Sequence, residues 1–443
     1  MDKLRELYLE GKAVIVKNVG YPQMNMSHFH GRDIMFLGVD GTDDDSGVES
    51  GWMGRWLDTE YPDYPDAYPN EEMQDPIAIE MGNAMSIAFH RDDGIPVGLN
   101  IQNPQAFYDL INGVGVGGEQ FFRPGGHAGD EYEYLWQFEG MSNAYAGRLR
   151  DVYLAGGEPS VQYPTEYPYL CPDNFRNNPL SGQLSLIARL LAGGIKTRIF
   201  LCRLGGFDTH AGQVESSQKT YGAHAALLYH LFTSAKLFQD DLATRSLEEK
   251  VLTMTFSEFG RRVSDNESLG TDHGTSMPVF IFGNENKIKG GLLGNNPDLN
   301  NLNNGNMEYS TDYRNIYASV IYDWFGASPE GIEASGFSDW ADQRLDIFGV
   351  TGLDNWKKTK DGVSCFPNPA TVEVSFQFLM PAPGSVTIKI MNTLGQTVIE
   401  QKTGNQVYGL QIIPMDISNL DPGGYVYQIM GQVNIGTGQF VKL

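Results

Sequence analysis

Residues 199–210 read IFLCRLGGFDTH and residues 251–262 read VLTMTFSEFGRR, and these two stretches decide the fold class. Each begins with an apolar run typical of a buried strand and then turns polar. The chain between them has apolar residues every three or four positions, which predicts one long helix. Two strands joined by a helix predict a right-handed βαβ unit with parallel strands. We therefore expect an α/β fold.

Both stretches end in residues that bind metals. Asp208 and His210 follow the first strand, Glu258 follows the second, and Asp272-His273 comes shortly afterwards. In open α/β sheets, ligands bind beyond the carboxyl ends of the strands. Mixed oxygen and nitrogen ligands suit a divalent ion, and two such sets around one cleft fit a two-metal site. The sequence predicts zinc as the first choice, with manganese, magnesium or calcium as alternatives.

Some of these residues also have structural interpretations. Asp208 is suited to capping the helix that follows, and Glu258 with Arg262 forms an i,i+4 pair typical of a salt bridge. At a metal site, Glu258 is suited either to ligation or to accepting an imidazole N–H. For His90 and His127, which have no partner at ligand spacing, a structural role is favoured. Because the other groups converge on successive strand ends, we favour a metal site for them.

A nucleophile and an anion-binding group are expected near the metal. Ser27 is the best-placed hydroxyl, because it follows the strand predicted at 13–19 and adjoins His28. A serine beside a metal ion is an activated nucleophile. Arg261 or Arg262 is suited to holding a phosphate or sulfate oxygen with its bidentate guanidinium. We assign Ser27 and Arg261 as the candidate catalytic residues.

The composition excludes several kinds of partner. With 31 Lys and Arg against 55 Asp and Glu, the formal charge is -24, which argues against nucleic acid or an anionic membrane as partner. No apolar run reaches the roughly 18 residues of a transmembrane segment. The residues after Met1 also lack the apolar core of a signal peptide.

The pattern changes near the C-terminus. Residues 356–363 are polar and predict a linker. Beyond them apolar and polar residues alternate, as they do around Val372, Val374, Phe376 and Phe378. A period of two with Pro-Gly and Asp-Pro-Gly-Gly turns predicts a small antiparallel β-sandwich of seven or eight strands at 364–443. An α/β domain at 1–355 precedes the linker.

Three motifs of the first domain occur in order: GGFDTH at 205–210, SEFGR at 257–261 and TDHG at 271–274. The segments 11–29 and 312–326 extend the pattern on both sides. Together they resemble domain-of-unknown-function family 1501 of the alkaline-phosphatase-like superfamily, over about residues 1 to 350. The resemblance implies a mostly parallel sheet sandwiched by helices. It also implies phosphoryl or sulfuryl transfer with two metal ions and a Ser or Thr nucleophile.

The chain departs from that family at two points. Members begin with a strand that ends in a Gly-Gly-Asn-Asp-Gly-like motif, and this chain begins after it. Moreover, His273 is its last histidine, so the further downstream metal-binding histidine of typical alkaline phosphatases is missing. We therefore expect the α/β domain to lack its first strand.

The C-terminal part carries a second resemblance. FPNPA at 366–370, NTLGQ at 392–396, the run from Leu420 to Tyr425 and the closing VKL are similar to the sorting domain of the type IX secretion system of Gram-negative bacteria. The resemblance implies that residues 364–443 engage the type IX machinery and that the protein is secreted or lies on the outer cell surface. Because that route requires a signal peptide, we expect the natural N-terminus to lie upstream of Met1.

Two functional hypotheses follow. The first is a secreted metal-dependent hydrolase of phosphate or sulfate esters, acting on a small-molecule or glycan ester. The second is a secreted surface or adhesion protein that keeps the fold but is catalytically inactive. The metal-binding residue types favour the enzyme, and the missing first strand favours the inactive protein. Metal content distinguishes the two hypotheses.

Overall fold

The computed structural model describes residues 1–42, 47–82, 84–103, 109, 144–348, 363–366, 368–380, 384–392, 395–406, 409–431 and 434–443. The chain divides into two compact units, Met1–Gly349 and Val350–Leu443. The linker predicted at 356–363 lies outside the described residues except for Val363, so its boundaries stay a prediction.

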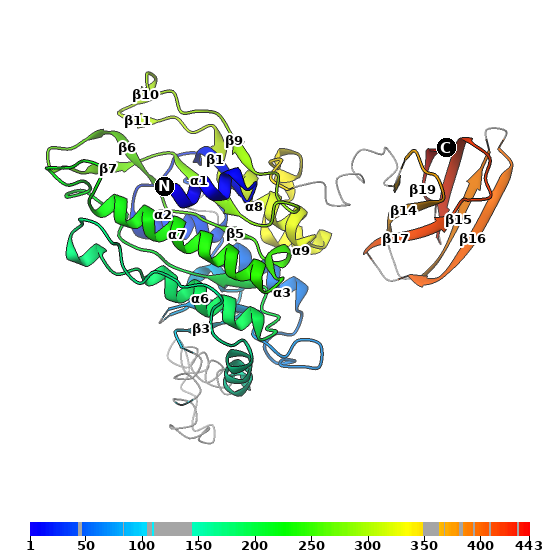
Figure 1. Cartoon of the computed structure of the whole chain (residues 1–443), viewed down its shortest axis with the longest axis horizontal. Helices are drawn as coiled ribbons and strands as arrows, with labels where there is room; N and C mark the ends of the chain where they lie inside the picture. The colour runs from blue at the N-terminus through cyan, green and yellow to red at the C-terminus, as the bar shows by residue number, and fades with distance from the viewer. Residues whose placement is uncertain are drawn as a thin grey trace. The chain divides into compact units, whose positions relative to one another are not determined.

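The first unit is a mixed α/β domain whose larger sheet has five strands (Figure 1). Strand β1 pairs in parallel with β9 and β12, whereas β8 pairs antiparallel with both β1 and β5. The strands are β1 (Ala13–Gly20), β5 (Thr253–Met254), β8 (Met277–Phe282), β9 (Gly291–Leu293) and β12 (Thr311–Asp312). The expected α/β class is confirmed, but this sheet is mixed rather than mostly parallel.

A smaller sheet of the same unit is wholly parallel. Strand β2 (Ala78–Met81) lies between β3 (Leu99–Ile101) and β4 (Ile199–Leu201). The predicted βαβ unit is therefore wrong in its pairing, because β4 pairs with β2 while β5 pairs with β8. After β5 the chain returns through a hairpin of β6 (Gly260–Asp265) and β7 (Thr271–Gly274). Without a helical crossover, the next strand runs antiparallel.

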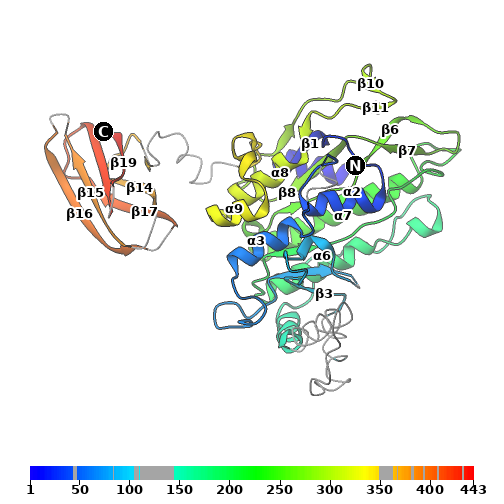
Figure 2. The same cartoon turned by 180° about the vertical axis from the view of Figure 1, so that it is seen from behind.

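Helices pack around these sheets. The long helix predicted between β4 and β5 is present as α7, which packs on α1 and lies beside α6 in both views (Figures 1 and 2). Asn178 caps α6, since its side chain accepts from the backbone N–H groups of Leu180 and Ser181. The helices are α1 (Asp2–Leu9), α2 (His28–Leu37), α3 (Trp52–Glu60), α6 (Pro179–Ala192), α7 (Ala223–Thr244), α8 (Tyr313–Ser319) and α9 (Pro329–Ser335).

Short elements complete the unit. A second hairpin is formed by β10 (Leu302–Asn303) and β11 (Asn306–Met307). A π-helical turn, η4 (Val320–Phe325), continues α8. The 3-10 turns are η1 (Ile87–Phe89), η2 (Asp173–Phe175), η3 (Glu248–Lys250) and η5 (Ser338–Gln343).

One hydrophobic core joins both sheets of the first unit. It includes Val14 and Val16 of β1, Ile281 of β8, and Ile79 of β2, all fully or nearly fully buried. Burial of this kind stabilises a fold by about 25 cal/mol per Å² of apolar surface. The loops at the strand ends are therefore supported by well-packed strands. In the described part of the chain, no helix is both long enough and apolar enough to cross a bilayer.

The second unit is antiparallel, as the alternating sequence predicts. Its seven described strands form sheets of three and four strands around one core, where Phe376 and Tyr427 from the two sheets lie 4.7 Å apart between ring centroids. The strands are β13 (Val363–Phe366), β14 (Glu373–Met380), β15 (Gly384–Met391), β16 (Thr397–Gln406), β17 (Gly409–Asp416), β18 (Gly423–Met430) and β19 (Asn434–Lys442).

Candidate metal centre

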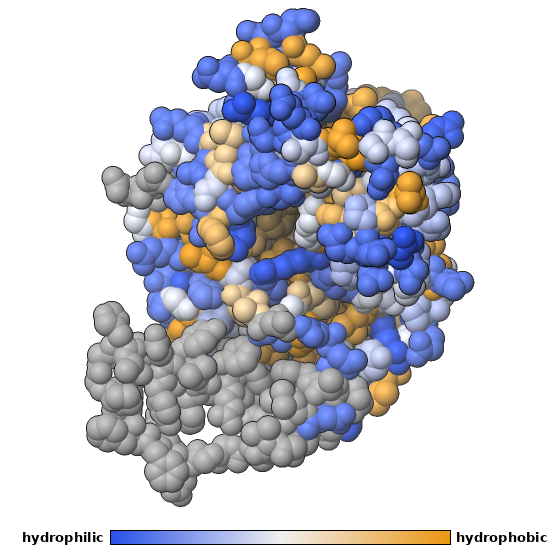
Figure 3. Space-filling view, turned by 90° about the vertical axis from the view of Figure 1, so that its left-hand side faces the viewer, coloured by the Kyte–Doolittle hydropathy of each residue, from blue (hydrophilic) through white to orange (hydrophobic). Residues whose placement is uncertain are grey.

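The metal-binding residues predicted from the sequence come together in one cluster of the α/β domain. They are carried by the loop after β4, the loop after β5 and the hairpin β6–β7, and the start of α2 joins them. Figure 3 looks onto the end of the domain that carries this hairpin, and it shows a hollow bordered by many hydrophilic residues. The residues that contact one another are His28, Asp208, His210, Glu258, Arg261, Asp272 and His273.

The carboxylate of Asp208 is the centre of the cluster. Its Oδ1 lies 2.8 Å from His273 Nε2, 3.0 Å from His210 Nε2 and 2.7 Å from Arg261 Nη1. Its Oδ2 lies 3.0 Å from His28 Nε2. Burial opposes ionisation of this carboxyl group, but hydrogen bonds from Arg261, His273 and His28 outweigh that effect. They hold the pKa of Asp208 well below its usual range.

The other nitrogen of each histidine also faces an acceptor. The partners of the three Nδ1 atoms are Glu258 Oε1 for His28 (2.9 Å), the Met26 carbonyl oxygen for His273 (2.8 Å) and Asp272 Oδ1 for His210 (3.1 Å). Carboxylate and carbonyl oxygens only accept, so each Nδ1 carries the proton. A neutral imidazole has a single N–H, so each Nε2 then presents a lone pair to Asp208. Acceptors facing each other at about 3 Å need a cation between them, either a second proton on the imidazole or a metal ion.

The charges around the cluster agree with this requirement. The hydrogen bond to Glu258 raises the pKa of His28 against the opposing effect of burial, with further help from Asp208. Hydrogen bonds from Asn266 and His210 lower the pKa of Asp272. The carboxyl groups of the site thus favour the ionised state, and a positive charge between them and the imidazoles is stabilised. The same ionised carboxylates attract a divalent cation.

Arg261 holds Asp208 in place. Its Nη1 donates to Asp208, its Nε donates to Thr271 Oγ1 at 3.1 Å, and its Nη2 donates to the Thr271 carbonyl oxygen. The Thr271 hydroxyl donates in turn to Gln213 Oε1 at 2.8 Å. All three nitrogens of this guanidinium are therefore engaged within the protein, so Arg261 is placed to position Asp208.

Close packing fixes helix α2 against the cluster. A Cβ on Gly31 would lie 2.9 Å from the Asn25 carbonyl oxygen and 3.1 Å from that of Glu258, so glycine lets the helix approach the loop after β5. Phe259 stacks on the His273 ring with centroids 4.1 Å apart. Contacts of this kind restrict the imidazole rings to the orientations that the hydrogen bonds require.

The donor set fits a divalent metal. His28, Asp208 and His273 each offer one ligand atom, and these atoms all lie within 4.8 Å of one another. Two imidazole nitrogens and one carboxylate oxygen suit zinc, which in catalytic sites takes three protein ligands and leaves a fourth position open. Behind His28, Glu258 takes the second of the two roles considered for it from the sequence, that of an acceptor for the imidazole N–H.

The structure separates the predicted ligands into two groups. Asp208 and His273 belong to the group whose atoms converge, whereas His210, Glu258 and Asp272 adjoin it through hydrogen bonds. Of the two histidines given a structural role, His90 lies outside this cluster and has a pKa lowered by burial. His127 lies outside the described residues.

His28 is the member of the cluster that the sequence motifs do not include. It adjoins Ser27 and follows the strand predicted at 13–19, just as Asp208 follows its strand, but it is not among the predicted metal ligands. Ser27 itself is the exposed N-cap residue of α2, and its backbone N–H donates to Asn25 Oδ1 at 2.8 Å. Applying the strand-end rule to every histidine would have found His28.

Comparison with known families identifies the domain around this cluster. Residues 164–322 match the family described as "Protein of unknown function (DUF1501)". The chain carries a DUF1501 domain. The matched range includes Asp208, His210, Glu258 and the TDHG motif, while His28 lies N-terminal to it.

The C-terminal unit matches a second family, described as "Secretion system C-terminal sorting domain", over residues 364–442. This confirms the predicted type IX sorting domain, so the protein engages that secretion system and is secreted or lies on the outer surface. No curated protein matches the chain. The family description assigns no activity to the DUF1501 domain.

Proposed function

We propose that the DUF1501 domain is a metal-dependent hydrolase of phosphate or sulfate esters that acts outside the cell. The observation that carries the proposal is the arrangement around Asp208. The Nε2 atoms of His28 and His273 face its carboxylate, while their Nδ1 atoms face other acceptors. A neutral imidazole can donate to only one of its two acceptors. A bound divalent ion would satisfy all of them at once. The resemblance to the alkaline-phosphatase-like superfamily supports phosphate and sulfate esters as the substrate class.

Zinc is the metal that we propose, held by His28, Asp208 and His273. Imidazole ligands suit zinc and, less well, manganese, whereas magnesium and calcium prefer oxygen ligands. When bound, the ion supplies a Lewis acid that polarises the phosphoryl or sulfuryl oxygen of the ester. Glu258 keeps His28 in the tautomer that ligation needs. The described residues form one such group, so the proposal is for a single ion there.

Arg262 is the guanidinium that we assign to the substrate, in place of Arg261. The sequence suggested either arginine for this role and Arg261 was assigned, but the nitrogens of Arg261 are engaged by Asp208 and Thr271. The Nε atom of Arg262 is buried and has no hydrogen-bond partner among the described residues. Its charge contributes to the lowered pKa of Asp272. Arg262 therefore brings a positive charge near the cluster, and a phosphate or sulfate oxygen carries the opposite charge.

Ser27 is the proposed nucleophile. Its exposed side chain directly precedes His28, so its hydroxyl group lies next to a proposed metal ligand along the chain. In the proposed reaction, Ser27 Oγ forms a bond to phosphorus or sulfur, and the alcohol leaves with the serine proton. Water then cleaves the new serine ester, which releases phosphate or sulfate and restores the hydroxyl group.

Metal binding by the purified chain tests this proposal. After treatment with EDTA and its removal, we expect calorimetry to show one Zn²⁺ per chain with a Kd below about 1 μM. His28→Ala should weaken binding at least roughly tenfold because it removes a ligand. Asp173→Ala, in which a fully exposed carboxylate is lost, is the matched control and should change nothing. A chain that binds neither Zn²⁺ nor Mn²⁺ at micromolar concentration would contradict the proposal and favour the inactive surface protein.

Zinc affinity should fall as the solution is acidified. The pKa of His28 is raised above its ordinary value of 6.5, so below that pKa a proton occupies the nitrogen that faces Asp208. Zinc binds only the unprotonated imidazole, so the association constant should rise as pH rises through this pKa and then level off. Calorimetry from about pH 5.5 to 8.5, in two buffers of different ionisation enthalpy, measures both the affinity and the protons released. A pH-independent affinity would exclude His28 as a ligand.

A further inference from the structure

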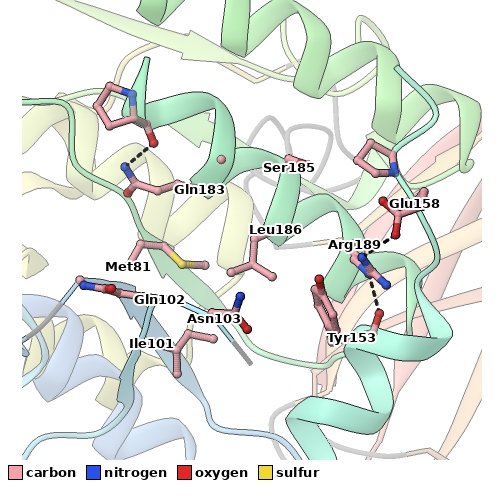
Figure 4. A pocket seen from close by; sticks show the side chains of 14 residues that line it. Met81, Ile101, Gln102, Asn103, Tyr153, Glu158, Gln183, Ser185, Leu186 and Arg189 are labelled. Atoms are coloured by element: carbon pink, nitrogen blue, oxygen red, sulfur yellow. Dashed lines mark hydrogen bonds and ion pairs between the residues drawn. The ribbon is translucent and has the colours of Figure 1, made fainter. Parts of the chain in front are cut away.

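Buried polar groups in proteins almost always have hydrogen-bond partners, so each exception needs an explanation. Figure 4 shows the usual case in a cavity of about 540 Å³ at the ends of β2 and β3. The carboxamide of Gln183 lines this cavity, but its nitrogen and its oxygen both bond to the backbone of Arg203. Two side chains on the neighbouring strands β6 and β11, those of Arg262 and Asn306, are exceptions.

Arg262 has a buried donor without an acceptor. Its Nε atom is buried and has no hydrogen-bond partner among the described residues. The adjacent Arg261 differs, because its Nε donates to Thr271 Oγ1 at 3.1 Å and its two Nη atoms are engaged as well. The guanidinium that we assign to the substrate is therefore the one that still needs an acceptor at its Nε.

The hairpin β10–β11 lies against Arg262. Strand β11 packs beside β6, and a Cβ built on Gly305 in the hairpin turn would lie 3.8 Å from Arg262 Nη1. The next residue, Asn306, is only 9% exposed, and its Oδ1 is buried without a partner in the described part of the chain. A buried donor that lacks an acceptor and a buried acceptor that lacks a donor therefore lie on neighbouring strands.

The hairpin can shift towards Arg262 at little cost. Its ladder consists of two residue pairs, Leu302 with Met307 and Asn303 with Asn306. A two-stranded ladder this short has little stability of its own. Each unpaired buried group is unfavourable, because it has lost its bonds to water without gaining a bond in the protein. A hydrogen bond from Arg262 Nε to Asn306 Oδ1 would remove both penalties at once.

We propose that Asn306 is a positioning residue for Arg262, which rests on the proposed role of Arg262 in substrate binding. The Arg262 Nε–H donates to Asn306 Oδ1, which fixes the plane of the guanidinium and leaves Nη1 and Nη2 for the substrate. N–H groups held in one plane match two oxygens of a phosphate or sulfate ester. Asn306 then serves Arg262 as Thr271 serves Arg261.

Thermal melting of the metal-free full chain tests whether the two side chains pair. Asn306→Asp has nearly the same shape and places a carboxylate at the acceptor position. Beside the Arg262 cation, this carboxylate should form a charge-assisted bond and raise the melting temperature of the α/β domain by about 2 °C or more. A carboxylate buried away from any cation would lower that temperature instead. The rise should therefore become a fall when Arg262 is replaced by methionine. The matched control is Asn301→Asp, at an exposed position of the same loop, which should give no rise.

Binding of inorganic phosphate to the zinc-loaded chain tests the positioning role. Asn306→Ala should weaken phosphate binding about fivefold or more in calorimetry, because the guanidinium loses its orientation. Arg262→Lys keeps the positive charge but has no Nε donor. In the Arg262→Lys background, Asn306→Ala should therefore change the phosphate Kd less than about twofold. A merely structural Asn306 would instead give the same loss in both backgrounds.

Each contrary outcome has a definite meaning. A fall in melting temperature for Asn306→Asp in the otherwise unchanged chain overturns the proposal, because no cation is then within reach. Equal losses of phosphate affinity in the two backgrounds, or a chain that binds no phosphate, overturn the positioning role. If Asn306→Ala fails to fold, Asn306→Leu, which is closer to asparagine in volume, takes its place. If the chain binds no zinc, the proposed hydrolase fails, and melting together with phosphate binding by the metal-free chain still decides the role of Asn306.

Discussion

Replacing Asp208 with asparagine is expected to lower the zinc affinity of the DUF1501 domain several hundredfold. Asparagine has nearly the same shape, but its neutral carboxamide is a poor zinc ligand beside two imidazoles. Structural zinc sites gain about 10–16 kcal/mol from four ligands, so one ligand is worth about 2.5–4 kcal/mol. Asp208 is also the one carboxylate that three imidazoles and Arg261 share. Its loss removes the common counter-charge of the cluster.

Glu258→Gln is the informative comparison for this measurement. Glu258 contacts the far nitrogen of His28 and belongs to the outer shell of the cluster. Loss of such an outer partner typically costs 10–100-fold in metal affinity. The Kd values measured by calorimetry should therefore rise from wild type to Glu258→Gln and again to Asp208→Asn. If Asp208→Asn binds zinc as tightly as wild type, or if Glu258→Gln is the weaker binder, Asp208 is not the central ligand.

The sequence predicted the elements of the fold better than their pairing. The strands at β1 and β4 and the helix α7 are strongly patterned, and all three are present. The partner of each strand depends on long-range contacts that no local pattern encodes. Strand β5 has only two residues in the ladder, and the hairpin that follows it reverses the chain before β8. Periodicity alone therefore could not show that β4 and β5 lie in different sheets.

For the candidate site, the residue types at the strand ends indicated which residues form the cluster. They did not indicate the role of each residue. The strand-end rule selected Asp208 and His273, which converge in the structure. It did not separate ligands from the residues behind them, because Glu258 and Asp272 differ from Asp208 only in which atoms they contact. Likewise, Arg261 and Arg262 are adjacent in sequence, and only side-chain contacts show that Arg261 is already engaged.

Ser27→Ala is expected to lower turnover at least roughly a thousandfold while leaving zinc affinity nearly unchanged, because it removes the proposed nucleophile and no metal ligand. The stability of the fold should also be nearly unchanged. Loss of an N-cap serine usually costs about 0.5–2 kcal/mol through its side-chain hydrogen bond, but the Ser27 side chain makes no capping bond in α2. A loss of turnover in a variant with the wild-type melting temperature and zinc Kd would therefore report on chemistry alone.

The measurement uses p-nitrophenyl phosphate and p-nitrophenyl sulfate with the zinc-loaded chain, and the better substrate decides between the two ester classes. Ser257→Ala is the matched control, because Ser257 is the other serine at the cluster and its hydroxyl donates to Glu258 Oε2 at 3.2 Å. Since that hydroxyl supports an outer partner of His28, its loss should cost far less turnover than the loss of Ser27. Full turnover by Ser27→Ala would remove the covalent step and leave direct attack by water, with the metal site unaffected. Loss of turnover by Ser257→Ala alone would instead place the nucleophile on the loop after β5, beside Glu258.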